Sequence, residues 1–239
     1  MSLTPLPRIA RPVDAVVEKL RQEILAGTFP AGEHLPPERE LATQLGISRL
    51  TLRAGLARLE AEGLVRARQG DGVRVLDVEQ HATLAVLAHL DFVRRPEVLR
   101  SFLELRRAVA VEAVALACER ASKKAIDALE KLAEAQISET DPARYAARDV
   151  EFARGVLVAA ESFAALLLFN SLAPIYEAHP ELAAALSADR EKSLAGYGIT
   201  IALLRGKDPA QARALVREAL EAVDAAALEK LTRKKRSRS

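Results

Sequence analysis

The chain of 239 residues has little of what marks secreted, membrane or aromatic-rich β proteins. It contains one cysteine, Cys118, no tryptophan, and 4% aromatic residues. A single cysteine excludes an intramolecular disulfide, so we expect a cytoplasmic protein. Its apolar runs fall well short of the roughly 20 residues that cross a membrane, and prolines and acids interrupt the start of the chain where a signal peptide would be apolar. Half of the residues are nevertheless apolar, which with so few aromatics predicts packed helices.

The net charge of +2 is small, but the charges are unevenly distributed. Six of the 35 Lys and Arg lie in the last ten residues, so 29 basic residues face 33 acidic ones in the rest of the chain. General basicity therefore does not account for binding to a polyanion. Any such binding would depend on a few well-placed arginines.

The N-terminal part, residues 1–76, is predicted to be a winged helix-turn-helix domain. Apolar residues at helical spacing, glycine stops and a Ser48 cap predict three helices, and alternating apolar and basic residues around a Gly-Asp-Gly turn predict a two-stranded wing. The expected elements are helices at 13–26, 38–44 and 48–62, and strands at 65–69 and 73–75.

The fold class is predicted to be mainly α. After the N-terminal domain, residues 77–230 are predicted to form an all-α bundle of six or seven helices. The sequence places helix starts at Pro96, Ser122, Asp141-Pro142 and Asp208-Pro209. Between the last two, Phe152 to Tyr176 and Leu182 to Leu204 are each predicted to be helical. The basic stretch 231–239 is predicted to be a disordered tail.

The third predicted helix has a leucine-rich core face and an outer face with arginines. Arg49 and Arg53 lie one turn apart there, with Leu50 and Thr51 beside them. Guanidinium groups bond guanine O6 and N7 in the DNA major groove, and a threonine methyl contacts thymine. This helix is therefore the candidate reader of bases, while arginines before and after it are placed to meet phosphates. Those arginines are Arg39, Arg66, Arg68 and Arg74.

The segment LPPERELATQLGISRLTLRAGLARLEAEGLV (Leu35 to Val65), followed by RQGDGVRV, closely resembles the winged helix-turn-helix of GntR-family bacterial transcription regulators. The resemblance implies DNA contacts by Arg39, Arg49, Thr51, Arg53 and the wing tip, Gln69 and Gly70. Three residues depart from the family pattern. Pro37 replaces a serine or alanine, Leu50 replaces a commonly polar residue and favours a thymine methyl, and Asp71 places an acid at the wing tip.

The helical part, with FLELRRAVAVEAVALACERAS (Phe102 to Ser122) and GKDPAQARALVREAL (Gly206 to Leu220), resembles the FadR subfamily. Many of its members bind a divalent metal through an aspartate and three histidines. Asp149 matches the aspartate, whereas Ala153, Tyr197 and Ala219 stand where the histidines would be. We therefore expect no metal.

Three segments resemble the fatty-acid-responsive type of that subfamily: His81 to Asp91, the LRR of the first long helix, and Asp149 to Leu172. The resemblance implies an acyl-CoA effector as a lead. Arg106 or Arg148 would meet an anionic head group, and apolar residues would line a tunnel for the chain. The predicted ligand-binding residues are Arg106, Arg148, Asp149, Phe152 and Tyr197, with Val156, Phe163, Leu166, Phe169 and Tyr176 as further tunnel candidates.

The sequence thus predicts a ligand-responsive transcription regulator that binds a near-palindromic double-stranded DNA operator as a homodimer. The effector would act through a linker near Leu76 to His81. Two alternatives stay open: a FadR-subfamily regulator of a small organic acid, and a non-specific architectural DNA-binding protein that uses the basic tail. We find no nucleophile paired with a base, no set of metal ligands and no phosphate-binding glycine loop, so we expect no enzyme activity. The short apolar runs lead us to expect no membrane partner either.

Overall fold

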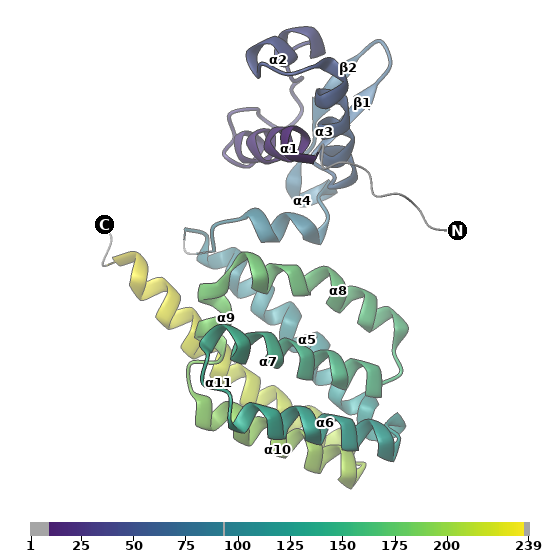
Figure 1. The fold of residues 1–239 in the computed structure, drawn as a ribbon, viewed down its shortest axis with the longest axis vertical. Coiled ribbons are helices and arrows are strands. Elements are labelled where there is room, and N and C mark those ends of the chain that lie inside the picture. Colours follow the sequence, from purple (N-terminus) through teal and green to yellow (C-terminus); the bar gives the residue numbers. More distant parts are fainter. Residues whose placement is uncertain (1–9, 93, 237–239) are drawn as a thin grey trace. The chain divides into compact units, whose positions relative to one another are not determined.

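The computed structural model describes residues 10–92 and 94–236 and divides the chain into two compact units, Met1–Leu90 and Asp91–Ser239 (Figure 1). The structural division comes later than the predicted boundary after Leu76, because residues beyond the wing pack onto the first unit. Thr83 N donates to Glu62 O, and Leu76 N donates to Leu64 O, each at 2.9 Å. The predicted linker at 76–81 is therefore part of the N-terminal unit, and the connection to the second unit follows Leu90.

The described part of the first unit contains the three predicted helices and the predicted hairpin, followed by two short helices. Its elements are α1 (Ala10–Leu25), α2 (Glu38–Gln44), α3 (Arg49–Ala61), β1 (Val65–Arg68), β2 (Gly72–Val75), α4 (Val78–His81) and a 3-10 helix (Leu84–His89). Leucines on α3 supply the core, with Leu52 and Leu59 fully buried. Gly55 brings α1 close to α3, since a Cβ there would lie 2.9 Å from Val16 Cγ1.

The wing is a twisted antiparallel hairpin, and a third segment extends it. β1 and β2 pair Val65 with Val75 and Arg66 with Arg74. On the other edge of β2, Leu35 N donates to Val73 O and Val75 N to Glu33 O, each at 2.8 Å. The proline-rich connector between α1 and α2 therefore fixes the base of the wing.

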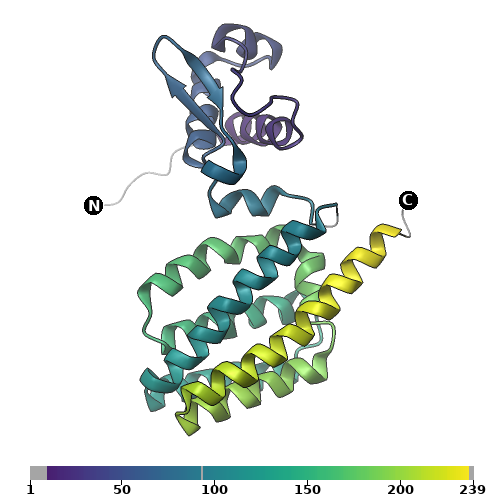
Figure 2. The same ribbon diagram turned by 180° about the vertical axis from the view of Figure 1, so that it is seen from behind.

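Seven α-helices make up the second unit as far as it is described. They are α5 (Pro96–Arg120), α6 (Lys123–Ile137), α7 (Pro142–Ala159), α8 (Phe163–Ala178), α9 (Pro180–Leu186), α10 (Arg190–Gly206) and α11 (Pro209–Arg236). The two longest, α5 and α11, lie side by side, as Figure 2 shows from behind. Buried residues of α5, α6, α7, α8, α10 and α11 form one apolar core.

Local capping predicts several of these helix starts correctly. Ser122 Oγ accepts from Ala125 N at 3.2 Å, and Asp141 Oδ1 accepts from Arg144 N at 2.8 Å. Asp208 Oδ1 accepts from Gln211 N at 2.9 Å in the same way. In each case a side-chain oxygen satisfies an amide that the first turn leaves unpaired.

Three predictions for this unit are wrong. The segment 152–176 is broken after Ala159, where Glu161 adopts a left-handed backbone (φ 49°). The segment 182–204 is broken after Leu186. The stretch 231–236, predicted to be disordered, continues α11, and Leu231 is buried at its start. Residues 237–239 of the predicted tail lie outside the described residues.

None of the helices in the described part of the chain combines the length and the apolar character that crossing a membrane requires.

Candidate functional site

The N-terminus of α3 is held rigidly by its cap and by α2. Ser48 Oγ accepts from Thr51 N at 3.1 Å and lies 2.8 Å from Thr51 Oγ1, so the cap also occupies the threonine hydroxyl. Arg53 Nε donates to Glu38 Oε2 at 2.7 Å. This ion pair joins the two helices of the motif and gives the Arg53 guanidinium a carboxylate partner.

The other residues predicted to contact DNA around α2 and α3 face solvent. Arg49, Leu50 and Arg39 are exposed, and Leu50 is 80% exposed. Within the described residues no hydrogen bond or ion pair is recorded for the guanidinium of Arg49 or Arg39. These two side chains are therefore available to a polyanion without first breaking a contact.

Three arginines lie on the exposed face of the wing. Arg66 and Arg74 are direct cross-strand partners, and Arg68 lies two residues along β1 on the same side. Like charges directly opposite one another destabilise a hairpin. Phosphate groups near this face would offset that repulsion. Binding of a nucleic acid would therefore stabilise the arrangement of arginines on the wing.

The wing tip contains both predicted tip residues, and His34 of the connector, which the sequence did not single out, lies beside it. Gln69 and Gly70 are exposed, and Gly70 has φ +83°, as a tight turn requires. His34 Nε2 lies 3.3 Å from Asp71 Oδ1. The acid that departs from the family pattern therefore has a histidine partner from the connector, a pairing that only the third segment of the wing could reveal.

A second cluster of polar side chains lies inside the helical unit. The Tyr197 hydroxyl donates to Asp149 Oδ1, and Gln136 Nε2 donates to Tyr197 Oη at 3.1 Å and to Tyr145 O at 3.0 Å. The ring of Phe152 packs on that of Tyr197 with 4.4 Å between centroids. Three of the predicted ligand-binding residues, Asp149, Phe152 and Tyr197, are thus in direct contact.

Burial dominates the electrostatics of this interior. It raises the pKa of the Asp149 carboxyl, although the Tyr197 hydroxyl and the positive charge of Arg106 oppose the change. It also raises the pKa of Tyr197, and that of Tyr176 to about 12. Both phenols are therefore neutral hydrogen-bonding groups at any physiological pH.

Arg106 lies near this interior with its charge already compensated. Its Nη2 donates to Asp224 Oδ1 at 2.5 Å, and Arg107 Nη1 donates to Asp224 Oδ2 at 2.8 Å. The Nε of Arg106 is buried and has no hydrogen-bond partner. One carboxylate thus serves two guanidinium groups.

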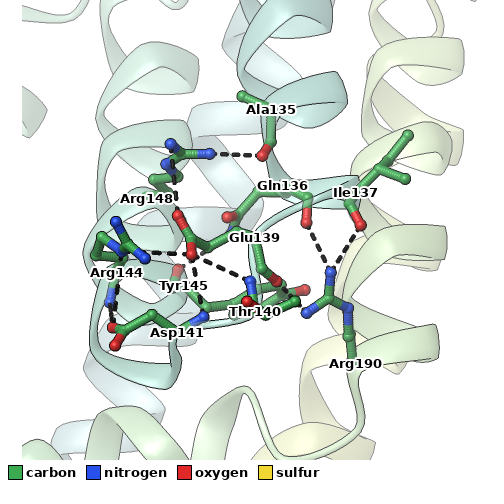
Figure 3. A network of polar contacts seen from close by, with 10 residues as sticks. All are labelled: Ala135, Gln136, Ile137, Glu139, Thr140, Asp141, Arg144, Tyr145, Arg148 and Arg190. Atoms are coloured by element: carbon green, nitrogen blue, oxygen red, sulfur yellow. Dashed lines mark hydrogen bonds and ion pairs between the residues drawn. The ribbon is translucent and has the colours of Figure 1, made fainter.

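Arg148 belongs to a different network, at the turn between α6 and α7 (Figure 3). It donates to Ala135 O at 2.5 Å and lies 3.5 Å from Glu139 Oε2. Arg190 of α10 donates to the carbonyls of Gln136, Ile137 and Glu139. The two arginines thereby satisfy carbonyls that the C-terminus of α6 leaves unpaired. Among the contacts of the described residues, those of Arg148 lie at this turn and none joins it directly to the interior cluster.

Glu139 completes the same turn. Its carboxylate accepts from the amides of Asp141 and Thr140 at 3.0 and 3.1 Å. These backbone bonds, with Arg144 and Arg148 nearby, lower the pKa of Glu139. This turn is therefore a structural joint between helices.

The tunnel candidates divide between the core and the surface. Phe152, Val156 and Phe169 are buried in the apolar core, while Leu166 and Tyr176 are half-buried. Phe163 is 76% exposed, so its assignment to an interior tunnel is wrong. A ligand chain would have to displace packed side chains.

The interior does not fit the metal site of the resembled subfamily. No group of three or more His, Cys, Asp or Glu side chains in the described ranges could hold a metal ion. The neighbour of Asp149 is the Tyr197 hydroxyl, which binds it as a hydrogen-bond donor, and Ala153 and Ala219 offer no ligand atoms. The Asp149 carboxylate therefore has a hydrogen-bond donor beside it where the metal site of the subfamily would have a second ligand.

Comparison with known proteins supports both units. The model of bacterial regulatory proteins of the gntR family matches residues 12–75, and that of the FCD domain matches residues 101–222. The chain is 38% identical over 188 residues to the HTH-type transcriptional regulator Mce2R of Mycobacterium tuberculosis, covering 77% of each protein. It is 28% identical over 169 residues to the fatty acid metabolism regulator protein of Haemophilus influenzae, covering 70% of this chain and 69% of that protein.

A solved structure has the same fold. Lar, described as controlling the expression of the Listeria monocytogenes agr system, aligns over 96% of this chain and 99% of its own, with a TM-score of 0.61 and 18% identity. With the arginine-bearing α3, the wing and the two matched domains, these likenesses agree with the resemblance seen in the sequence. The chain belongs to the GntR family of bacterial transcription regulators and carries an FCD domain, consistent with the FadR subfamily.

Proposed function

We propose that this regulator binds a near-palindromic DNA operator as a homodimer, with α3 in the major groove and the wing beside it. The observation that carries the proposal is the placement of Arg39, Arg49 and Arg53 around the capped start of α3. A helix presented in this way reads base edges with its first residues. Two-fold symmetry of the protein then requires two related half-sites.

The wing arginines would contribute affinity more than sequence preference. Arg66, Arg68 and Arg74 would bind phosphates, which fix register but carry no base information. Their contribution should fall steeply with salt because condensed counterions are released on binding.

The test is a gel-shift titration of the full chain with a site selected from randomised DNA and with random competitor. Arg49→Ala should lose about 1–3 kcal/mol of binding free energy and relax the base preference. Arg58→Ala is the matched control, because Arg58 lies on the same helix but is paired with Asp14 of α1. Undiminished and equally selective binding by Arg49→Ala would refute the assignment of α3 as the reader.

The alternative of an architectural DNA-binding protein predicts a different titration. Such a protein would bind random and selected DNA nearly equally, whereas a regulator keeps a specificity ratio of at least about a thousand at physiological salt. The mostly acidic body of the chain favours the regulator.

A location in the cytoplasm, where the operator is, follows from the same proposal.

We further propose that the FCD domain binds an anionic effector near Arg106, Asp149, Phe152 and Tyr197. The contact of Asp149 with Tyr197 and the unpartnered Nε of Arg106 support it. A fatty acyl-CoA is the lead, since the Haemophilus influenzae relative is a fatty acid metabolism regulator. A small organic acid is the alternative.

Native mass spectrometry of the purified full chain tests the effector. Mass additions matching acyl-CoA, and release or strengthening of the operator complex by acyl-CoA but not by free CoA, would support the lead. A response to short carboxylates alone would favour the small-acid alternative, and a bound metal would overturn the conclusion that the interior does not fit one.

A further inference from the structure

The exposed face of α3 carries an apolar stripe. Leu50, Ala54, Ala57 and Ala61 follow one another at helical spacing, and all four are exposed. Leu50 is 80% exposed, the highest value recorded among exposed large hydrophobic residues in the described part of the chain. The outer face of a surface helix is normally polar, so this stripe indicates a surface that binds a partner.

The surroundings of the stripe indicate that its partner is a polyanion. Arg49 and Arg53 flank it on one side, and the wing adds three exposed arginines to the same unit. A protein surface would have to bring matching acids, whereas DNA supplies phosphates on both sides of the groove. The alanines allow the helix backbone to approach the partner closely.

Within the stripe, Leu50 has the position and the rigidity to contact bases. It lies in the first turn of α3, which the Ser48 cap fixes. The neighbouring Thr51 hydroxyl is engaged with Ser48, and Arg53 is engaged with Glu38. The leucine side chain itself has no hydrogen-bonding atom.

In the major groove the base edges present hydrogen-bonding atoms and one apolar group, the 5-methyl of thymine. 5-Methylcytosine presents the same group. We propose that Leu50 is a specificity-determining residue that reads a pyrimidine 5-methyl group in each half-site. The proposal rests on the proposed function, since it requires α3 to lie in the groove.

The experiment removes the methyl group alone. With the full chain and its selected operator, each thymine of a half-site is replaced in turn by deoxyuridine, which differs only in that methyl. Burial of one methyl group corresponds to about a four-fold change in Kd. We expect one symmetric position to show this loss with the wild-type chain.

Variants then assign the methyl to Leu50. In Leu50→Ala the thymine and deoxyuridine operators should bind equally, while Ala61→Ser, at the far end of the stripe, should keep the four-fold difference. At the same position, 5-methylcytosine should bind more tightly than cytosine if the methyl is read independently of its base. Equal binding of these two would contradict a readout of the methyl group on any pyrimidine.

Other outcomes separate this inference from the proposed function. If the wild-type chain selects a site but no deoxyuridine replacement weakens binding, the methyl readout is refuted and the regulator stands. If Leu50→Ala keeps its sensitivity to deoxyuridine, another side chain reads the methyl and the assignment fails. If the wild-type chain prefers no sequence over random DNA, the proposed function itself fails. Because Leu50 is exposed, circular dichroism should show Leu50→Ala folded as the wild type.

Discussion

The shared carboxylate of Asp224 offers a direct test of what stabilises the helical unit. Asp224 is 5% exposed and joins Arg106 and Arg107 of α5 to α11. Asp224→Asn keeps the size and shape of the side chain and removes its charge. Two guanidinium groups then share one amide in place of one carboxylate.

The expected loss follows from where those groups lie. Removing one partner of a buried ion pair costs about 3–5 kcal/mol, because the other charge stays buried. The side chains of Arg106 and Arg107 keep 18% and 21% of their surface exposed, so some hydration returns. Arg106 Nε already lacks a partner. We therefore expect about 3 kcal/mol, at the lower end of that range.

Glu112 provides a matched comparison in the same two helices. Its carboxylate binds Arg213 through two oxygens, with 3.0 Å from Nε to Oε1, but the two side chains are 53% and 41% exposed. Exposed pairs contribute about 0–1 kcal/mol. Glu112→Gln should therefore cost much less than Asp224→Asn, although the chemistry of the pair is the same.

The assay is urea unfolding of the full chain followed by far-UV circular dichroism, fitted with one transition for each unit. The transition of the helical unit should move to lower urea in Asp224→Asn with an unchanged slope. Added salt should weaken the exposed pair and leave the buried one nearly unaffected. A loss under 1 kcal/mol in Asp224→Asn, or one no larger than in Glu112→Gln, would refute the reasoning.

Three further predictions concern both units. Gly63→Ala should destabilise the N-terminal unit by about 2–4 kcal/mol in thermal unfolding, because φ is +75° and a Cβ would lie 2.0 Å from the His81 carbonyl oxygen. Glu38→Gln releases Arg53 and removes a negative charge, so gel shifts should show tighter binding to random DNA and a smaller specificity ratio; an unchanged ratio would contradict a positioning role. The pKa of Asp149 is raised in the folded state, so wild-type stability relative to Asp149→Asn should fall as pH rises above the ordinary value of about 4; urea titrations at several pH values that run parallel would contradict it.

The features predicted correctly from the sequence depend on neighbours within one turn. Ser48 and Ser122 cap helices because a hydroxyl two or three residues ahead of a free amide is a local geometry. The break at Glu161 was missed because no glycine or proline marks it. Leu231 was missed because a single apolar residue in a basic stretch gives no periodicity, yet it is buried and α11 continues through it.

In the candidate site, too, local features were predictable from the sequence and contacts between helices were not. Exposure of Arg49 and Leu50 follows from the leucine pattern on the opposite face of α3, so the reading face was predictable. The pairing of Arg53 with Glu38 joins residues 15 apart on different helices. No spacing rule relates them, because the angle between α2 and α3 decides the contact.

The division of the chain after Leu90 changes which element would carry a signal from effector to DNA under the proposed function. The segment 76–81 lies within the N-terminal unit, and Leu76 N and Thr83 N bond to Leu64 O and Glu62 O beside the end of α3. The chain enters the second unit just before α5, and α5 carries Arg106 and Arg107 in its middle. A ligand that competes with Asp224 for these arginines would act on α5 relative to α11. Under the proposed function, a displacement of α5 would reach the DNA-binding unit through the chain that precedes Pro96, and the coupling could be only as strong as the ligand's preference for one arrangement of α5 and α11.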